Sequence, residues 1–426
     1  MRLKHIALAL LVATALTGCN DTLDTATIDL KTVKNKVEQP LPAKILADMQ
    51  AKNMPRNSPI MIRILKEEGK LEVWKARADN RFEVIKSYDI CAWSGKLGPK
   101  VKEGDRQAPE GFYTLTPAHL NPNSKYYLAI NTGFPNRYDA ANGRSGSNLM
   151  IHGACSSSGC YSMTDEQVLE IYAFARDAFR GGQTAVQLQA FPFRMTAENM
   201  ARHRDNQNFD FWKMIKIGYD NFEVTKRPPE VNVCEKKYVF NQQLTGNGTF
   251  APASACPPMS TPPALVSALT SYEKTYDIAY EKALDKYDGK VWYEPSEAER
   301  KAVVADKRKG RELAYAPTGT SLEAGKLMSE SEFKELMEKR MAAAHAKSAP
   351  ANSVLLASAG PTSRSSSAAE RMKQDRLPTA TTPSTAPAIM SAQGKPAAVP
   401  VPAQNPLAYA AAPPVEEAKK PFWKFW

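Results

Sequence analysis

The 426-residue sequence predicts a β-rich α+β domain that is followed by charged helices and a disordered tail. Short segments rich in β-branched and aromatic residues, separated by Gly, Pro and Asn, predict strands in the first half of the chain. A capping-box pattern before residue 168 predicts a helix among these strands. From about Ser348 the chain is dominated by Ala, Pro, Ser and Thr, a composition that cannot bury enough apolar surface to fold.

The strands and helices are bounded by recognisable turn and cap residues. Two apolar runs flank Glu67-Glu68-Gly69 and predict a β-hairpin. Apolar residues at helical spacing follow Thr164-Asp165-Glu166-Gln167 and end at Gly181-Gly182. The predicted strands are 60–65, 71–75, 82–92, 111–115, 126–131, 148–152 and 185–190, and the predicted helices are 168–180 and 209–219.

Composition shifts divide the rest of the chain. Segments 265–286, 297–309 and 321–346 are rich in Ala, Glu, Lys and Leu and predict charged helices. We therefore expect a signal peptide, an N-terminal tether, a folded domain, a helical extension and a disordered tail that ends in aromatic and basic residues. Their predicted bounds are 1–18, 19–57, 58–240, 241–346 and 347–426.

The N-terminus predicts export. Arg2 and Lys4 precede a short apolar run that ends in Leu16-Thr17-Gly18-Cys19, which resembles a bacterial lipobox. We expect Cys19 to be lipidated, so that the protein is anchored to a membrane and faces the periplasm; an ordinary signal peptide that contains a cysteine is the alternative. Asn20 after the cysteine favours the outer membrane.

Export to an oxidising compartment allows the cysteines to form disulfides. Without Cys19, five of the six cysteines remain, an odd number in an oxidising compartment, so one thiol should lie outside the disulfides. Cys234 and Cys256 are close in sequence and flank a Gly- and Asn-rich stretch, so we predict that they form a disulfide. Pairing Cys91 with Cys155 is a second possibility, and it would leave Cys160 for chemistry.

A histidine and a cysteine lie eight positions apart, at His152 and Cys160. An imidazole close to a thiol is a common way to generate the reactive thiolate near neutral pH. The predicted strand ends at His152 and the predicted helix begins soon after Cys160, and catalytic groups are often held at such loop ends. The alternative is that both residues have only structural roles.

Several motifs, in order, resemble the L,D-transpeptidase catalytic domain (YkuD type), and in particular its YafK-like branch. The resemblance covers roughly residues 59–238. It rests on Ser94–Lys100, Glu103–Asp105, Ala108–Tyr113, Ile151–Gly153 and Ser158–Asp165.

The resemblance implies a role for each site residue. Cys160 would be the nucleophile, His152 the general base, and the carbonyl of Gly153 the group that orients the imidazole. Ser157, Ser158 and Gly159 would shape the oxyanion site. Arg137, Tyr138 and Arg144 could bind substrate carboxylates, or they could be ordinary loop residues.

The implied reaction is acyl transfer through a thioester on peptidoglycan stems that contain meso-diaminopimelate. Broader family members carry a second histidine where this chain has Ser158, and they have a longer gap between the first histidine and the cysteine; this departure is shared with the YafK-like branch. It favours hydrolysis of the link between peptidoglycan and an outer-membrane lipoprotein. Transpeptidation, which forms 3-3 cross-links or attaches the lipoprotein, is the alternative, and a non-catalytic wall-binding lipoprotein is a second one.

The basic balance of the chain, a net charge of +11 with a pI of about 9.2, would ordinarily suggest nucleic acid. Export argues against nucleic acid, so an anionic cell wall or lipid surface is the expected partner; the alternative is that these lysines only keep the chain soluble. We expect no metal and no cofactor. Aromatic residues alternate with lysines in Lys419–Trp426, which suits a membrane interface or a partner protein.

Overall fold

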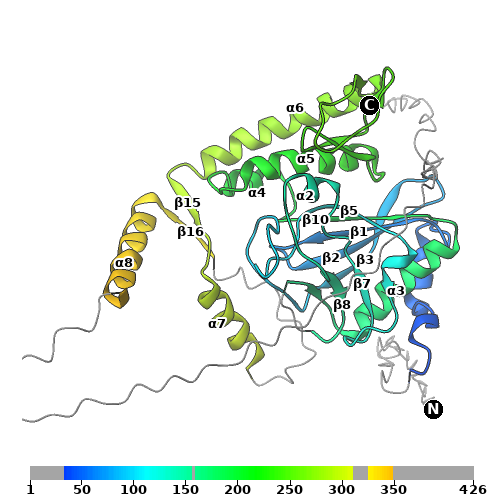
Figure 1. Cartoon of the computed structure of the whole chain (residues 1–426), viewed down its shortest axis with the longest axis horizontal. Helices are drawn as coiled ribbons and strands as arrows, with labels where there is room; N and C mark the ends of the chain where they lie inside the picture. Colours follow the sequence, from blue (N-terminus) through cyan, green and yellow to red (C-terminus); the bar gives the residue numbers. More distant parts are fainter. Residues whose placement is uncertain (1–32, 156–158, 310–324, 349–426) are drawn as a thin grey trace, which may run out of the picture. The chain divides into compact units, whose positions relative to one another are not determined.

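The computed structural model describes residues 33–155, 159–309 and 325–348 (Figure 1). Its largest sheet is made of predicted strands. The strand order is β3 (Phe82–Asp89), β2 (Lys70–Ala76), β1 (Ile60–Leu65), β10 (Val186–Phe191) and β5 (Gly111–Leu115). Only the β1–β10 pair in this sheet is parallel.

A second sheet is made of five short strands that begin at Ala92 and end at Ser162. Its order is β4 (Ala92–Trp93), β9 (Tyr161–Ser162), β8 (Met150–His152), β7 (Ala129–Asn131) and β6 (Leu120–Asn121). The β8–β9 pair is parallel and the other pairs are antiparallel. This parallel pair determines where the candidate site lies.

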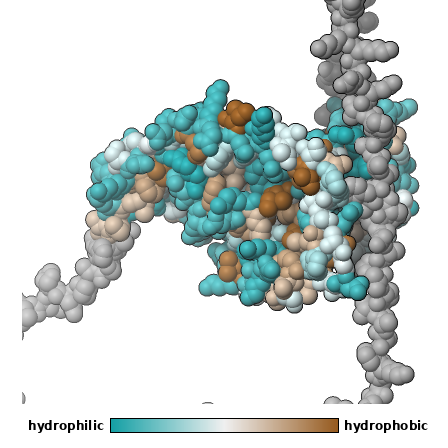
Figure 2. Space-filling model, turned by 90° about the horizontal axis from the view of Figure 1, so that it is seen from above, coloured by the Kyte–Doolittle hydropathy of each residue, from teal (hydrophilic) through white to brown (hydrophobic). Residues whose placement is uncertain are grey.

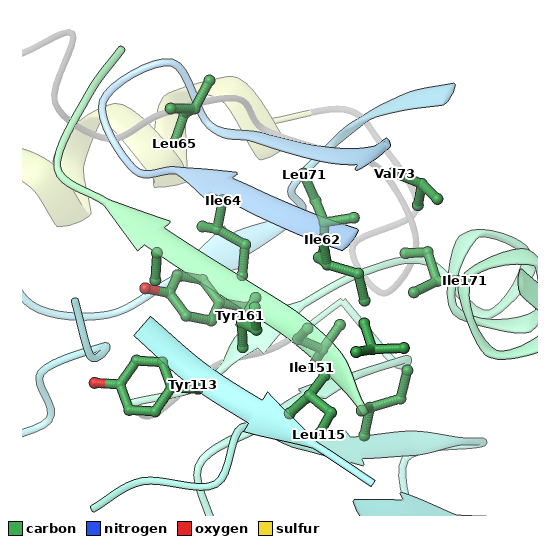
Figure 3. Packing of buried hydrophobic residues seen from close by; sticks show 14 of the residues in the cluster. Ile62, Ile64, Leu65, Leu71, Val73, Tyr113, Leu115, Ile151, Tyr161 and Ile171 are labelled. Atoms are coloured by element: carbon green, nitrogen blue, oxygen red, sulfur yellow. The ribbon is translucent and has the colours of Figure 1, made fainter. Parts of the chain in front are cut away.

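Helix α3 (Asp165–Arg180) packs against both sheets, with contacts to β1, β7 and β8. Its start is fixed by a capping box, in which Thr164 accepts from the Gln167 N–H and Gln167 accepts from the Thr164 N–H. Figure 3 shows side chains from the first sheet, the second sheet and α3 meeting in one apolar core. They include Ile62, Ile64, Tyr113, Leu115, Ile151, Tyr161 and Ile171, all of them buried.

Smaller elements surround these layers. Before β1 lie η2 (Lys36–Glu38) and α1 (Ala43–Ala51). Along the chain, η3 (Pro117–His119) lies between β5 and β6, and α2 (Arg137–Ala141) lies between β7 and β8. After β10 come α4 (Ala197–Arg202), α5 (Phe209–Thr225), β11 (Val231–Cys234), β12 (Lys237–Phe240), β13 (Gln243–Leu244), β14 (Met259–Ser260) and α6 (Pro263–Lys286). The last are β15 (Lys290–Tyr293), α7 (Glu297–Arg308), β16 (Lys326–Ser329) and α8 (Glu330–Ser348).

The predicted fold class is confirmed, and several element boundaries differ from the prediction. The predicted strand 126–131 begins only at Ala129, and the helix predicted near 209–219 continues to Thr225. The predicted strand 82–92 is two strands, because the chain leaves the first sheet after Asp89 and joins the second at Ala92. The predicted helix 321–346 begins only at Glu330, because residues 326–329 pair with β15. The predicted tail from 349 onward, the signal peptide and Cys19 lie outside the described residues.

The surface is mixed in polarity. In the face shown in Figure 2, hydrophobic residues form separate spots among hydrophilic ones. Among the described residues, no helix combines the length and apolar character needed to span a membrane.

A buried ion pair joins β1 to the rest of the domain. The side chains of Lys66 and Glu110 are fully buried and lie 2.8 Å apart. The Lys66 ammonium also donates to the carbonyls of Gly98 and Ala108, and Glu110 accepts from the Trp212 indole N–H at 2.9 Å. Because both charges have hydrogen-bond partners, the pair can be kept in an interior that otherwise disfavours charge.

Removing one partner of this pair should be costly. Glu110→Ala leaves Lys66 buried without its counter-charge, so we expect the free energy of unfolding to fall by about 3–5 kcal/mol. Lys70→Ala removes an ion pair with Asp89 whose side chains are well exposed, and should change stability by only about 0–1 kcal/mol. Urea denaturation of both variants measures the difference. Similar losses in the two would contradict the assigned importance of the buried pair.

Candidate active site

The parallel pairing of β8 and β9 brings His152 and Cys160 to neighbouring strands. Ile151 is opposite Tyr161 in the register, and His152 is opposite Ser162. Cys160 directly precedes β9, and its Sγ accepts a hydrogen bond from the Met150 N–H at 3.4 Å. Alternate residues of a strand share a face, so Met150 and His152 lie on one face while Ile151 points into the core (Figure 3). The thiol therefore lies against Met150, the first residue of the strand that ends at His152.

The imidazole of His152 is buried and oriented by backbone. Its Nδ1 lies 2.6 Å from the carbonyl oxygen of Gly153. Because a carbonyl can only accept, Nδ1 carries the hydrogen, and Nε2 of the neutral ring is left as the proton acceptor. Burial lowers the pKa of His152, and the Gly153 carbonyl partly offsets this effect. The ring is therefore neutral near pH 7, as a general base must be.

The thiol of Cys160 is partly buried, and it lies 3.6 Å from the carbonyl oxygen of Asn148. Burial raises the pKa of Cys160, while the Met150 N–H and the positive charge of Lys100 act in the opposite direction. This direction differs from the expectation that the imidazole keeps a thiolate near neutral pH. Near neutral pH these shifts favour a protonated thiol and a neutral imidazole.

The structure contains both disulfides considered from the sequence. Cys91 is bonded to Cys155, and Cys234 is bonded to Cys256. Cys160 is in neither bond. The Cys91–Cys155 bond ties the loop that follows His152 to the chain segment before β4.

The predicted oxyanion residues are only partly described. Ser157 and Ser158 lie outside the described residues, so their part in the site stays a prediction. Gly159 has a φ of 118°, a conformation that residues with a side chain rarely adopt. This requirement explains a glycine directly before the thiol.

The three residues expected to bind substrate carboxylates have other partners. Arg137 donates to the Phe250 carbonyl, and the buried ring of Tyr138 stacks on Tyr238. Arg144 forms an ion pair with the buried Asp139 at 2.9 Å. These contacts give the three side chains structural roles, and the binding role stays a prediction.

Sequence reasoning missed two side chains near the candidate pair. The ring of Tyr126, about half exposed, lies 4.6 Å from the His152 ring between centroids. Lys100 is buried, and its ammonium is held 2.5 Å from Asp105 and 2.9 Å from the Lys102 carbonyl. The sequence signal that could have identified Lys100 is its place in a motif that carries the family resemblance. Tyr126 gave no such signal, because it lies in a segment predicted only as a strand.

Among the described residues, no group of His, Cys, Asp and Glu side chains could hold a metal ion.

The reactivity of Cys160 provides a test of this electrostatic arrangement. Because burial raises its pKa, the rate of alkylation by iodoacetamide should reach half its maximum above the ordinary cysteine value of about 8.5. Lys100→Met removes a charge that lowers this pKa and should move the midpoint higher. Lys102→Met makes the same charge change at an exposed neighbour and should leave it in place. A midpoint that falls in Lys100→Met would contradict the assignment.

Comparison with known proteins places the chain in a family. The model of the L,D-transpeptidase catalytic domain (YkuD) matches residues 62–186. The putative L,D-transpeptidase YafK of Escherichia coli K12 is 47% identical over 188 residues, which are 44% of this chain and 76% of YafK. The protein of E. coli O157:H7 with the same name gives the same figures.

The solved structures that are similar to this chain have lower sequence identity. The helical cell shape determining protein Pgp2 from Campylobacter jejuni is 19% identical, with 45% of this chain and 79% of that chain covered and a TM-score of 0.27. Bdellovibrio bacteriovorus Bd1075 is 21% identical, with 40% and 61% covered and a TM-score of 0.23. The assignment depends on the sequence comparisons, and by these the chain belongs to the L,D-transpeptidase catalytic domain (YkuD) family, as a YafK-like member.

Proposed function

We propose that this protein is a periplasmic cysteine acyl-transfer enzyme that hydrolyses the link between peptidoglycan and an outer-membrane lipoprotein. Its substrate would be a peptidoglycan stem that contains meso-diaminopimelate. The observation that carries the proposal is the arrangement at β8 and β9. The imidazole of His152 is oriented by the Gly153 carbonyl, and a cysteine that is in neither disulfide contacts Met150, two residues before His152 on β8. The YafK-like family membership supports the substrate class.

The first half of the reaction forms a thioester. The Cys160 thiol gives its proton to Nε2 of His152 as sulfur attacks the carbonyl carbon on the L-centre of diaminopimelate. The amide C–N bond breaks, the leaving amine takes the proton from the imidazolium, and the acyl group stays on sulfur. The Met150 N–H, which already contacts sulfur at 3.4 Å, stabilises the negative charge that develops there.

The second half returns the enzyme to its starting state. Water gives a proton to His152 and attacks the thioester, the C–S bond breaks, and sulfur recovers the proton. The product is a free carboxyl group on the stem. Ser158 stands where broader family members carry a second histidine, and this departure favours water over an amine as the acceptor.

Transpeptidation is the second candidate, and the name of the E. coli relative favours it. In that reaction an amine of another stem, or of the lipoprotein, attacks the same thioester in place of water. The two candidates share Cys160 and His152 and differ only in the acceptor. Product analysis therefore separates them.

Replacing the nucleophile should abolish turnover. With lipoprotein-bearing sacculi as substrate, Cys160→Ala should lose about 10³-fold or more in rate. The matched control is the double variant Cys234→Ala and Cys256→Ala, which removes a disulfide elsewhere in the domain and should keep the chemistry. Mass spectrometry of the digests should show free lipoprotein and unlinked stems.

Other outcomes have distinct meanings. Full turnover in Cys160→Ala would exclude this cysteine as the nucleophile. A gain of 3-3 dimers with the wild-type protein would show transpeptidation instead of hydrolysis. No product of either kind would favour a non-catalytic wall-binding lipoprotein.

The membrane anchor proposed at Cys19 has its own test. Cys19→Ser should prevent lipidation, so the protein should lose labelling by an alkyne fatty acid and leave the membrane fraction. Cys160→Ser is the matched control and should be labelled like the wild type. Labelling of Cys19→Ser at the wild-type level would exclude this residue as the anchor.

A further inference from the structure

The loop after His152 is held at each of its first three N–H groups. Two of the three donate to backbone carbonyls, and the middle one, that of Ala154, donates to the side chain of Asp165 at 2.7 Å. The two backbone bonds are Gly153 N–H to the Tyr126 carbonyl at 3.1 Å and Cys155 N–H to the Met163 carbonyl at 3.0 Å. Asp165 is thus the side chain that anchors this loop.

The loop needs such an anchor because of its backbone conformation. Ala154 and Cys155 have φ angles of 63° and 48°, in the left-handed region that non-glycine residues disfavour. Two consecutive residues in this region persist only when their surroundings hold them there. The bond from Asp165 and the Cys91–Cys155 disulfide are the side-chain contacts that do so.

Asp165 also packs directly against the residue that orients the imidazole. A Cβ at position 153 would overlap Asp165 Oδ1 and approach the Tyr126 carbonyl oxygen to 2.9 Å, so the carboxylate and Gly153 are in close contact. Asp165 is largely buried and is the first residue of α3, a helix fixed in the core of both sheets. The carboxylate therefore has a rigid support.

We propose that Asp165 is a positioning residue for the general base. The connection runs from Asp165 to the Ala154 N–H, through the intervening peptide to the Gly153 carbonyl, and from there to Nδ1–H of His152. The carboxylate fixes where the Gly153 carbonyl points, and this in turn holds the ring with Nε2 toward the thiol. The assignment rests on the proposed function, because it takes His152 as the base.

Three variants of the full-length protein test this role. Asp165→Ala removes the acceptor and should lower kcat on lipoprotein-bearing sacculi by about 10- to 100-fold, with little change in KM. Asp165→Asn keeps an oxygen that can accept from Ala154 and should recover most of the rate. Gln167→Ala removes the side chain that accepts from the Thr164 N–H at the start of α3. It leaves the bond between Asp165 and Ala154 in place and should keep wild-type kcat.

A second measurement reports on the ring itself. In protein labelled with ¹⁵N-histidine, the wild-type His152 signals should show one tautomer, with the proton on Nδ1. Asp165→Ala should give a mixture of tautomers, whereas Asp165→Asn and Gln167→Ala should match the wild type. Circular dichroism verifies that each variant is folded.

The results separate this role from a structural one. Equal losses of kcat in Asp165→Ala and Gln167→Ala would show that Asp165 acts only by stabilising the start of α3. A wild-type kcat and a wild-type tautomer in Asp165→Ala would overturn the proposal. If the wild-type protein does not hydrolyse sacculi, the proposed function fails, while the tautomer measurement still decides whether Asp165 orients His152.

Discussion

The buried pair of Lys66 and Glu110 is the interaction on which the rest of the domain depends. Lys66 follows β1, and its ammonium donates to two carbonyls of the 98–108 segment as well as to Glu110. Glu110 in turn reaches the indole of Trp212 on α5. Charged groups in the interior are retained only when all of their partners are in place, so this network permits one arrangement of the sheet, the segment and the helix. The segment held in this way carries Lys100, whose charge acts on the thiol.

Burial sets the chemistry of the site as much as its geometry does. The low-dielectric surroundings disfavour the charged forms of both His152 and Cys160, so the pKa of the histidine falls, the pKa of the cysteine rises, and the two values move apart. Both groups are therefore favoured in their neutral forms near pH 7. In the proposed reaction, negative charge on sulfur would develop next to the Met150 N–H and in the field of Lys100, which both favour the thiolate.

Most of the fold and the central pair of the site could be predicted from sequence, because both leave local signals. Alternating apolar residues indicated the strands, and the spacing from His152 to Cys160 indicated the candidate pair. Contacts between distant segments could not be predicted in this way. The Tyr126 ring meets His152 only through the pairing of β7 with β8, and Asp165 reaches Ala154 only after α3 packs on both sheets. Tyr138 and Arg144 are residue types that could bind substrate carboxylates. In the structure, however, Tyr138 stacks on nearby aromatic rings and Arg144 forms an ion pair with Asp139.

The parallel pairing of β8 and β9 has a consequence for how the domain can vary. Parallel neighbours are usually joined by a crossover of a dozen or more residues, whereas only residues 153–160 separate these two strands. Surface loops of ordinary proteins accept insertions readily, because each added residue costs little entropy. Here the same stretch is tied at Cys155 to Cys91 and ends at the thiol, so added residues would change the register between imidazole and sulfur. In this chain, an insertion between residues 153 and 160 should therefore disturb the site more than an insertion of the same length in other connections of the domain.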